Sequence, residues 1–246
     1  MKVLSLNERD ISLQELIQII RSKGKTGLIL QLVQQAIIED YSAQNNITAT
    51  TEELQDWFDT FRKRQGLFSA AETENWMKDN YLTIDDLEKE AEISVLSGKI
   101  TDSFPKDVVE KYFVENKVNM DAVELYMLTV NEKEVAMELL AQIKEDGMDF
   151  MLLAREYSTD ERAKLGGYLG TIRRPNLQGN IAAAVFGAKP GDVVGPFETE
   201  AGHTLFQVSA IYPAVLDEQK EKEIRNNLFL RLLAEQEQKI CINWAV

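Results

Sequence analysis

The chain is poor in the residues that most often bind metals or form nucleophile–base pairs. Its 246 residues include one cysteine, Cys241, and one histidine, His203. A single cysteine excludes a disulfide within the chain and a cysteine cluster that holds a metal. A zinc site or a Ser-His-Asp triad needs residues that this chain barely has, although a lone histidine does not by itself exclude a triad. We therefore expect no metal and no other cofactor.

Long apolar runs and an excess of positive charge are also missing. No stretch approaches the ~18–20 apolar residues of a membrane-spanning helix, and the first residues, MKVLSLNERD, hold no apolar signal-peptide core. The formal net charge of -14 argues against nucleic acid and anionic lipid as partners. These absences predict a cytoplasmic chain without membrane insertion, unless a targeting segment was removed from the sequence.

The first half of the chain has the pattern of successive helices. Apolar residues recur at helical spacing, and glycines at 66 and 98 are typical helix stops. Three residue pairs have the spacing of capping boxes, which mark helix starts: Thr50/Glu53, Ser69/Glu72 and, more weakly, Thr83/Asp86. Behind the first of them lies an aromatic stripe, Trp57, Phe58 and Phe61. Such a stripe is usually core, but a small helical module can also leave it open as a ligand groove.

The pattern changes near residue 121. Short β-type runs at 123–130, 166–170, 193–197 and 203–212 alternate with two helical segments, 131–143 and 149–157, and a short one around 181–186. This order predicts an α+β domain with a small sheet. From Asp217 a broad apolar stripe returns at helical spacing, and such a stripe needs a partner. We expect this last helix to pack on the N-terminal helical module. The α+β domain would then be an insertion between two pieces of one helical domain.

Residues 121–213 resemble the parvulin family of peptidyl-prolyl isomerases. The motifs that carry the resemblance follow one another almost without gaps: Asp149-Phe150, LLAREYS (152–158), Asp160, Gly166-Gly167-Tyr-Leu-Gly170, Val185-Phe186, Lys189-Pro190-Gly191-Asp192, Val194-Gly195-Pro196 and Thr199-Glu-Ala-Gly202. The flanking helices are similar to those of SurA- and PrsA-type foldases. The resemblance implies three parts: a helical chaperone-like module (1–120), a parvulin-like domain (121–213) and a C-terminal helix (214–246).

The resemblance also implies a set of site residues. The family pairs two histidines beside a Cys or Asp, over an apolar floor. Alignment on the glycines puts Tyr126 and Thr204 at the histidine positions and Asp160 at the Cys/Asp position. Leu177, Ile181, Phe186 and Phe206 would form the apolar floor that binds the prolyl ring. We expect a hydrogen-bonded chain through Tyr126, Asp160 and Thr204, while His203 should point away from Thr204 because adjacent strand residues face opposite sides.

Two functions follow from this altered site. The first is a peptidyl-prolyl isomerase or foldase that acts on unfolded or precursor polypeptides. The second is a catalytically degenerate peptide-binding chaperone or escort that holds a client peptide before modification or export. An inert scaffold that joins an assembly through its last helix is a third reading, and a homodimer through the helical module is a further expectation. Plainer roles stay open for the site residues: Asp160 as a turn cap, Tyr126 and Thr204 as ordinary sheet residues.

Overall fold

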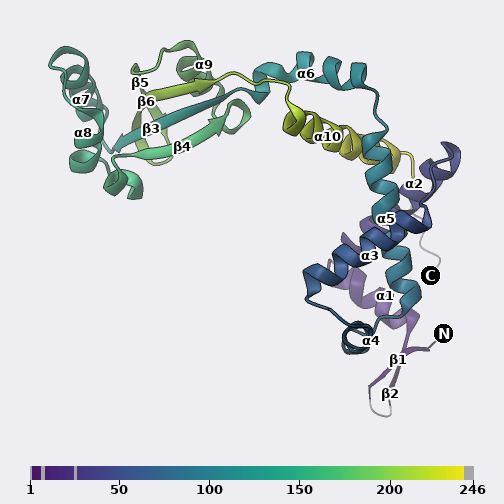
Figure 1. Cartoon of the computed structure of the whole chain (residues 1–246). Helices are drawn as coiled ribbons and strands as arrows, with labels where there is room; N and C mark the ends of the chain where they lie inside the picture. Colours follow the sequence, from purple (N-terminus) through teal and green to yellow (C-terminus); the bar gives the residue numbers. More distant parts are fainter. Residues whose placement is uncertain (1, 7–8, 25–26, 241–246) are drawn as a thin grey trace. The chain divides into compact units, whose positions relative to one another are not determined.

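The computed structural model describes residues 2–6, 9–24 and 27–240, and Cys241 lies outside this part of the chain. The described chain forms two compact units, one from residues 1–109 with 221–246 and one from residues 110–220 (Figure 1). Within the described ranges, no helix has both the length and the apolar character needed to cross a bilayer. The same ranges hold no group of three His, Cys, Asp or Glu side chains placed to bind a metal.

The first unit is mainly helical. It begins with a small antiparallel hairpin, β1 (Lys2–Leu6) and β2 (Arg9–Ser12), which the sequence pattern did not predict. Its helices are α1 (Leu13–Ser22), α2 (Gly27–Gln44), α3 (Thr51–Gln65), α4 (Ala70–Asp79) and α5 (Ile84–Asp102). Two more helices cross the boundary between the units, α6 (Lys106–Met120) and α10 (Glu218–Glu237).

Local capping determines where several of these helices begin and end. The three predicted capping boxes are confirmed, with reciprocal side-chain and backbone hydrogen bonds at Thr50, Ser69 and Thr83. Gly66 ends α3 in the left-handed conformation, as predicted. The predicted stop at Gly98 is wrong, because α5 continues to Asp102. Leu96 and Ile100 are both buried, so burial on each side of Gly98 outweighs its weak helix propensity.

The core of the first unit joins segments from both ends of the chain. Ile37 and Ile38 of α2, Leu96 and Ile100 of α5, and Leu233 of α10 form one buried cluster. The apolar stripe of the last helix is therefore covered within this unit. The aromatic stripe of α3 is only half-buried. Its Trp57 ring stacks on Phe61 with centroids 5.2 Å apart, and Phe61 meets Trp76 edge to face.

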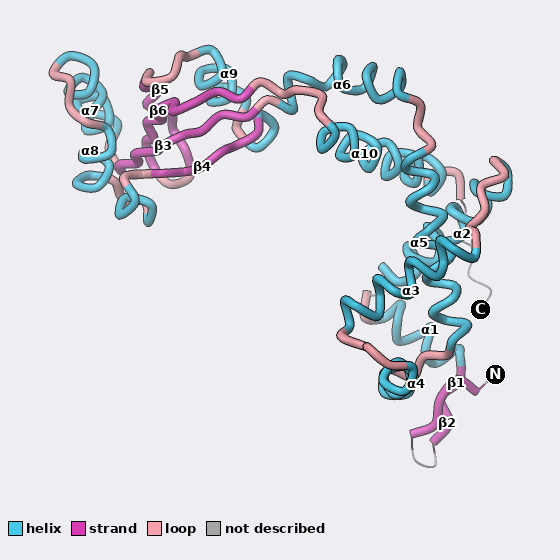
Figure 2. Tube along the Cα trace, viewed as in Figure 1, coloured by secondary structure: helices cyan, strands magenta, loops and turns pink. Residues whose placement is uncertain are grey.

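The second unit is built on a four-stranded antiparallel sheet with the order β4-β3-β6-β5. Its strands are β3 (Ala122–Val130), β4 (Tyr168–Arg173), β5 (Val193–Thr199) and β6 (Gly202–Tyr212). The helices are α7 (Lys133–Glu145), α8 (Phe150–Tyr157) and α9 (Gly179–Gly187), with short 3-10 turns η1 (Glu161–Leu165) and η2 (Arg174–Asn176). Figure 2 shows the strands side by side, with helices between them in the chain. The expected α+β domain is confirmed.

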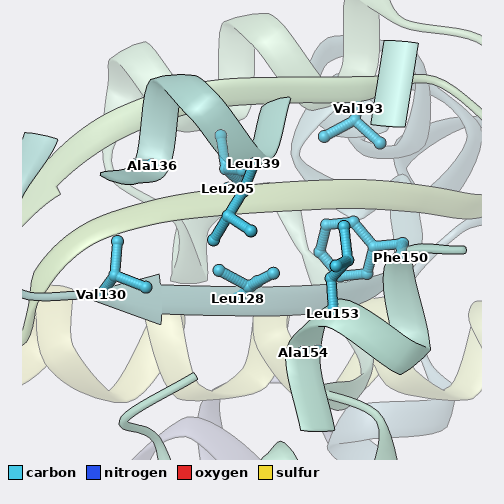
Figure 3. Packing of buried hydrophobic residues seen from close by; sticks show 9 residues of the cluster. All are labelled: Leu128, Val130, Ala136, Leu139, Phe150, Leu153, Ala154, Val193 and Leu205. Atoms are coloured by element: carbon cyan, nitrogen blue, oxygen red, sulfur yellow. The ribbon is translucent and has the colours of Figure 1, made fainter. Parts of the chain in front are cut away.

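Each face of this sheet carries its own core. On one face, helices α7 and α8 pack on the ends of the central strands (Figure 3). Buried residues of this cluster are Leu128, Val130, Ala136, Leu139, Phe150, Leu153, Ala154, Val193 and Leu205. On the opposite face, helix α9 packs on Val123, Leu125, Phe206 and Val208 through Ile181 and Val185. We call this second side of the sheet the α9 face.

Candidate functional site

The pairing of β3 with β6 determines which side chains share the α9 face. Met127 lies opposite Phe206, and Thr129 lies opposite Thr204, with the register unbroken between these pairs. Directly opposed residues of an antiparallel pair point to the same side of a sheet, and successive residues alternate. Met127, Thr129, Thr204 and Phe206 therefore all point to the α9 face.

An apolar floor forms on this face. Ile181 and Phe206 are buried in the core beneath α9, and the predicted floor residues Leu177 and Phe186 pack against that core. The rings of Phe197 and Phe206 lie 6.1 Å apart. Other members of the floor keep part of their surface exposed, so they remain available to an apolar ligand: Met127, Leu169, Leu177 and Phe197. The structure thus brings together the four predicted apolar residues, Leu177, Ile181, Phe186 and Phe206.

Phe186 is partly covered by a cation. The guanidinium carbon of Arg174 lies 4.2 Å from the centroid of the Phe186 ring, in cation–π geometry. Arg174 belongs to η2, which immediately precedes Leu177. This contact fixes the η2 segment on the end of α9, and through it the backbone that leads to Leu177.

A chain of threonine hydroxyls lies beside the floor. The Oγ1 atoms of Thr129 and Thr204 are 2.9 Å apart, and that of Thr199 is 3.3 Å from Thr204. Thr199 donates to the carbonyl oxygen of Gly202 at 2.9 Å. Each hydroxyl has one hydrogen to donate. Because the Thr199 hydrogen is used, Thr204 must donate to Thr199, and Thr129 must donate to Thr204.

This direction has a chemical consequence. All three hydroxyl hydrogens are committed within the chain, and Thr129 and Thr204 are almost fully buried. These threonines can accept a further hydrogen bond but have no hydrogen left to donate to a substrate carbonyl. Threonine hydroxyls also do not titrate near neutral pH, so this part of the site supplies no general acid or base.

Asp160 lies next to this region, in the loop that follows α8. The loop is tied to β3, because Thr159 N–H donates to the Thr129 carbonyl at 2.8 Å and the Ser158 hydroxyl accepts from Thr129 N–H at 3.1 Å. The Asp160 carboxylate accepts from the backbone N–H of Arg162 at 2.8 Å and pairs with its guanidinium at 3.2 Å. These contacts make Asp160 the cap of η1, which is the plainer role left open by the sequence.

Tyr126 does not join the predicted hydrogen-bonded chain. It pairs with Gln207 in β6, three residues from Thr204, and so it points to the opposite side of the sheet. There it packs against the core under α7 and α8, and its ring lies 5.2 Å from that of Tyr168. The predicted hydrogen-bonded chain between Tyr126 and Thr204 is therefore wrong, since an offset of an odd number of residues reverses the face of a strand residue. The residue that faces the site here is Met127.

The alternation of strand residues would have identified Met127 once the register was known. His203, by contrast, behaves as expected: it pairs with Val130, on the side away from Thr204. The catalytic roles assigned to Tyr126, Asp160 and Thr204 stay predictions, with their positions now defined.

Two glycines let the backbone approach the site closely. A Cβ atom on Gly167 would lie 2.1 Å from the carbonyl oxygen of Met127, and Gly167 has a φ of +81°. A Cβ on Gly195 would lie 2.8 Å from the carbonyl oxygen of Thr204. Both contacts are closer than a side chain allows, so glycine at these positions keeps neighbouring backbone segments packed against the strands that present Met127 and Thr204.

Comparison with known proteins gives a family and several relatives for this chain. Residues 129–210 match the model of the rotamase family described as the PPIC-type PPIASE domain. The foldase protein PrsA of Caldanaerobacter subterraneus is 26% identical over 197 residues, 80% of this chain and 60% of that protein. PrsA of Halalkalibacterium halodurans is 24% identical over 216 residues, 84% of this chain and 64% of that protein. The chaperone SurA of Salmonella choleraesuis is 36% identical over 80 residues, 32% of this chain and 19% of that protein.

Solved structures that share the fold over most or all of this chain include two bacterial proteins. A peptidylprolyl isomerase (PrsA) from Bacillus cereus has a TM-score of 0.53 at 14% identity, covering 100% of this chain and 94% of the other. The corresponding protein from Bacillus anthracis has a TM-score of 0.51 at 16% identity, covering 88% and 100%. This chain spans 60% to 64% of the length of the first two PrsA relatives.

Proposed function

We propose that this chain, a SurA/PrsA-like protein with a parvulin-type peptidyl-prolyl isomerase domain, is a foldase that handles unfolded or precursor polypeptides. In this proposal the α9 face binds a proline-containing segment, and isomerisation at that face is slow. The observation that carries the proposal is the apolar floor of Leu177, Ile181 and Phe206 beside a hydroxyl chain whose hydrogens are all committed.

Binding and turnover make different demands on such a site. Rotation about an X–Pro bond has a barrier of about 18–20 kcal/mol, and the uncatalysed change takes tens to hundreds of seconds. An apolar floor binds the prolyl ring and favours the twisted amide, which is less polar than the planar one. The partly exposed Met127, Leu169 and Leu177 supply this contact.

The site has few polar groups that are available to the substrate amide. Thr129, Thr199 and Thr204 use their hydrogens among themselves and on Gly202, and the Asp160 carboxylate is engaged by Arg162. Met127, which lies opposite Phe206 on this face, has no hydrogen to donate to a substrate carbonyl. These features support binding of the proline segment without rapid exchange.

Exchange spectroscopy by NMR tests the two parts of the proposal together. The probe is a short peptide with one Ala-Pro bond, measured with the full chain and, for reference, with a parvulin that has both histidines. We expect the peptide to bind, with cis–trans exchange at least about a hundredfold slower than with the reference protein. Rapid turnover would refute slow isomerisation, and the absence of binding would refute the site.

A second function, the catalytically degenerate chaperone or escort, is favoured by the same committed hydroxyls. It predicts that the chain suppresses aggregation of an unfolded client equally well when the client contains no proline. Light scattering during refolding of one client with proline and one without proline distinguishes this function from the foldase function. The scaffold reading has less support, because Ile224 and Leu233 of α10 are buried within the chain. The homodimer and the cytoplasmic location stay predictions, and sedimentation analysis tests the first.

A further inference from the structure

The side of the sheet opposite the α9 face is covered by helices at one end only. Helices α7 and α8 pack on Leu128, Val130 and Leu205. Towards the start of β3 and the end of β6, the same side carries a set of tyrosines around one carboxylate. We call this set the tyrosine face, and it consists of Glu124, Tyr126, Tyr168 and Tyr212.

Three adjacent strands build the tyrosine face. Glu124 of β3 accepts a hydrogen bond from the phenol of Tyr168 in β4 at 3.0 Å, and one from the phenol of Tyr212 in β6 at 3.0 Å. The Tyr126 ring, two residues along β3, lies 5.2 Å from the Tyr168 ring. Tyr168 and Tyr212 remain 41% and 48% exposed, so their rings are open to a ligand.

The Glu124 carboxylate is held by two phenols, one on each oxygen. Hydrogen bonding to Glu124 raises the pKa of both Tyr168 and Tyr212, so the phenols remain protonated donors. A carboxylate has about four acceptor sites on its two oxygens, and the phenols use one on each oxygen. The two phenol bonds thus position the carboxylate at the centre of the face, between the rings of Tyr168 and Tyr212.

A ligand for this arrangement needs a positive charge that can lie against aromatic rings. The faces of tyrosine rings attract cations, arginine more often than lysine, and a fixed carboxylate adds direct ion pairing. We propose that the tyrosine face binds an arginine or lysine side chain of an extended polypeptide. The proposal rests on the proposed function, because it supplies a second contact for the same kind of client. The tyrosine face lies on the side of the sheet opposite the α9 face, where we propose that the proline-containing segment binds.

The same contacts also stabilise the sheet, because cross-strand pairs of this kind contribute to its stability. The register further brings Arg173, opposite Ala122, to the end of this side of the sheet, and a bound peptide competes with that cation. A test must therefore measure the charge preference of binding and not only folding.

The experiment compares two proline-free peptides that differ in one residue. One carries a single arginine in a glycine–serine background, and the other carries citrulline, its neutral isostere, at the same position. Fluorescence anisotropy gives the affinity of the full chain for each. We expect the arginine peptide to bind roughly two- to fivefold more tightly. Equal affinities would overturn the proposal.

Three variants locate the preference. Glu124→Gln should abolish the difference between the peptides, and the double variant Tyr168→Phe/Tyr212→Phe, which keeps both rings, should reduce it. Glu134→Gln, which removes one exposed charge from α7, should leave it unchanged. A preference that persists in Glu124→Gln, or one that disappears equally in Glu134→Gln, would overturn the assignment to this face.

Leu177→Ala separates this proposal from the function on which it rests. It should weaken binding of a proline peptide and leave the arginine preference intact, because Leu177 lies on the α9 face. Loss of the arginine preference in Leu177→Ala would contradict the claim that the α9 face and the tyrosine face bind independently. If proline binding fails in the wild type while the arginine preference holds, the prolyl site is refuted and the tyrosine face stands.

Discussion

Thr129 and Thr204 face each other across the two central strands of the sheet, with their hydroxyl oxygens 2.9 Å apart and both side chains almost fully buried. Thr199 extends the contact to the carbonyl of Gly202. Leaving a buried hydroxyl without a partner costs free energy. The hydrogen bonds among these threonines therefore stabilise the end of the sheet beside the apolar floor. It does so with groups that neither titrate nor donate outward.

Replacing Thr204 by valine should destabilise the domain. Thr204→Val keeps the shape of the side chain but leaves the buried Thr129 hydroxyl without its acceptor. We expect a loss of about 1–3 kcal/mol in the free energy of unfolding, measured by denaturant titration. The double variant Thr129→Val/Thr204→Val should recover part of this loss. Thr171→Val, at an exposed position in β4, should change stability by less than about 0.5 kcal/mol. Equal effects at positions 171 and 204 would contradict the hydroxyl chain.

Gly167→Ala and Gly170→Ala form a matched pair of strain tests. Both glycines have positive φ, but a Cβ on Gly167 would meet the Met127 carbonyl oxygen at 2.1 Å, whereas a Cβ on Gly170 has open space around it. We expect Gly170→Ala to cost about 1–2 kcal/mol from backbone strain. Gly167→Ala should cost roughly 1–3 kcal/mol more, because the backbone must also move. Thermal unfolding of both variants gives the comparison, and equal losses would show that the close approach has no effect.

The titration of Tyr168 and Tyr212 reports on Glu124. Hydrogen bonding to Glu124 raises the pKa of each phenol, so the two bonds contribute stability below the ordinary tyrosine pKa of 10.0 and lose it as pH rises through the higher folded value. Glu124→Gln should lower the pKa of both phenols towards 10.0. Ultraviolet difference titration measures this, with Glu134→Gln as control. Unchanged tyrosine titration in Glu124→Gln would contradict the shared carboxylate.

Glu53 links the start of α3 to α5. Its carboxylate lies 2.8 Å from the Lys99 ammonium, which holds the pKa of Glu53 at about 2, below the ordinary 4.5. Because the folded pKa is lowered, the contact contributes fully above pH 4.5 and is lost as pH falls towards 2. Lys99→Met should raise the pKa of Glu53 towards 4.5 in a carboxyl NMR titration, and Lys78→Met should not. A wild-type Glu53 that titrates near 4.5 would refute the contact.

Features that depend on neighbouring residues could be predicted from the sequence. The capping boxes at Thr50, Ser69 and Thr83 formed as expected, because each depends on two residues three positions apart. Strand alternation likewise placed Thr204 with Phe206 and away from His203. The hairpin of β1 and β2 has no such local signature in the sequence. Helix α5 continued past Gly98 because of tertiary burial, which local propensity does not report.

The error at Tyr126 arose from register. In the structure β3 and β6 pair without a break from Leu125 to Val130, so Thr129 and not Tyr126 lies opposite Thr204. The residues within one strand do not specify which residue of the partner strand lies opposite. Alignment with the family did name Leu177, Ile181 and Phe206, and the structure brings these residues into one apolar cluster. It did not identify the threonine chain, which exists only when β3, β5 and β6 are paired.

The central claim is that the α9 face binds a proline-containing polypeptide, and NMR titration of the full chain with an uncharged Ala-Pro peptide tests it most directly. We predict amide shift changes at Met127, Leu169, Leu177 and Phe206. Leu177→Ala should weaken the binding, and Leu165→Ala, at an exposed position in η1, should leave it unchanged. Shift changes confined to the helical unit, or equal affinity for wild type and Leu177→Ala, would contradict the account.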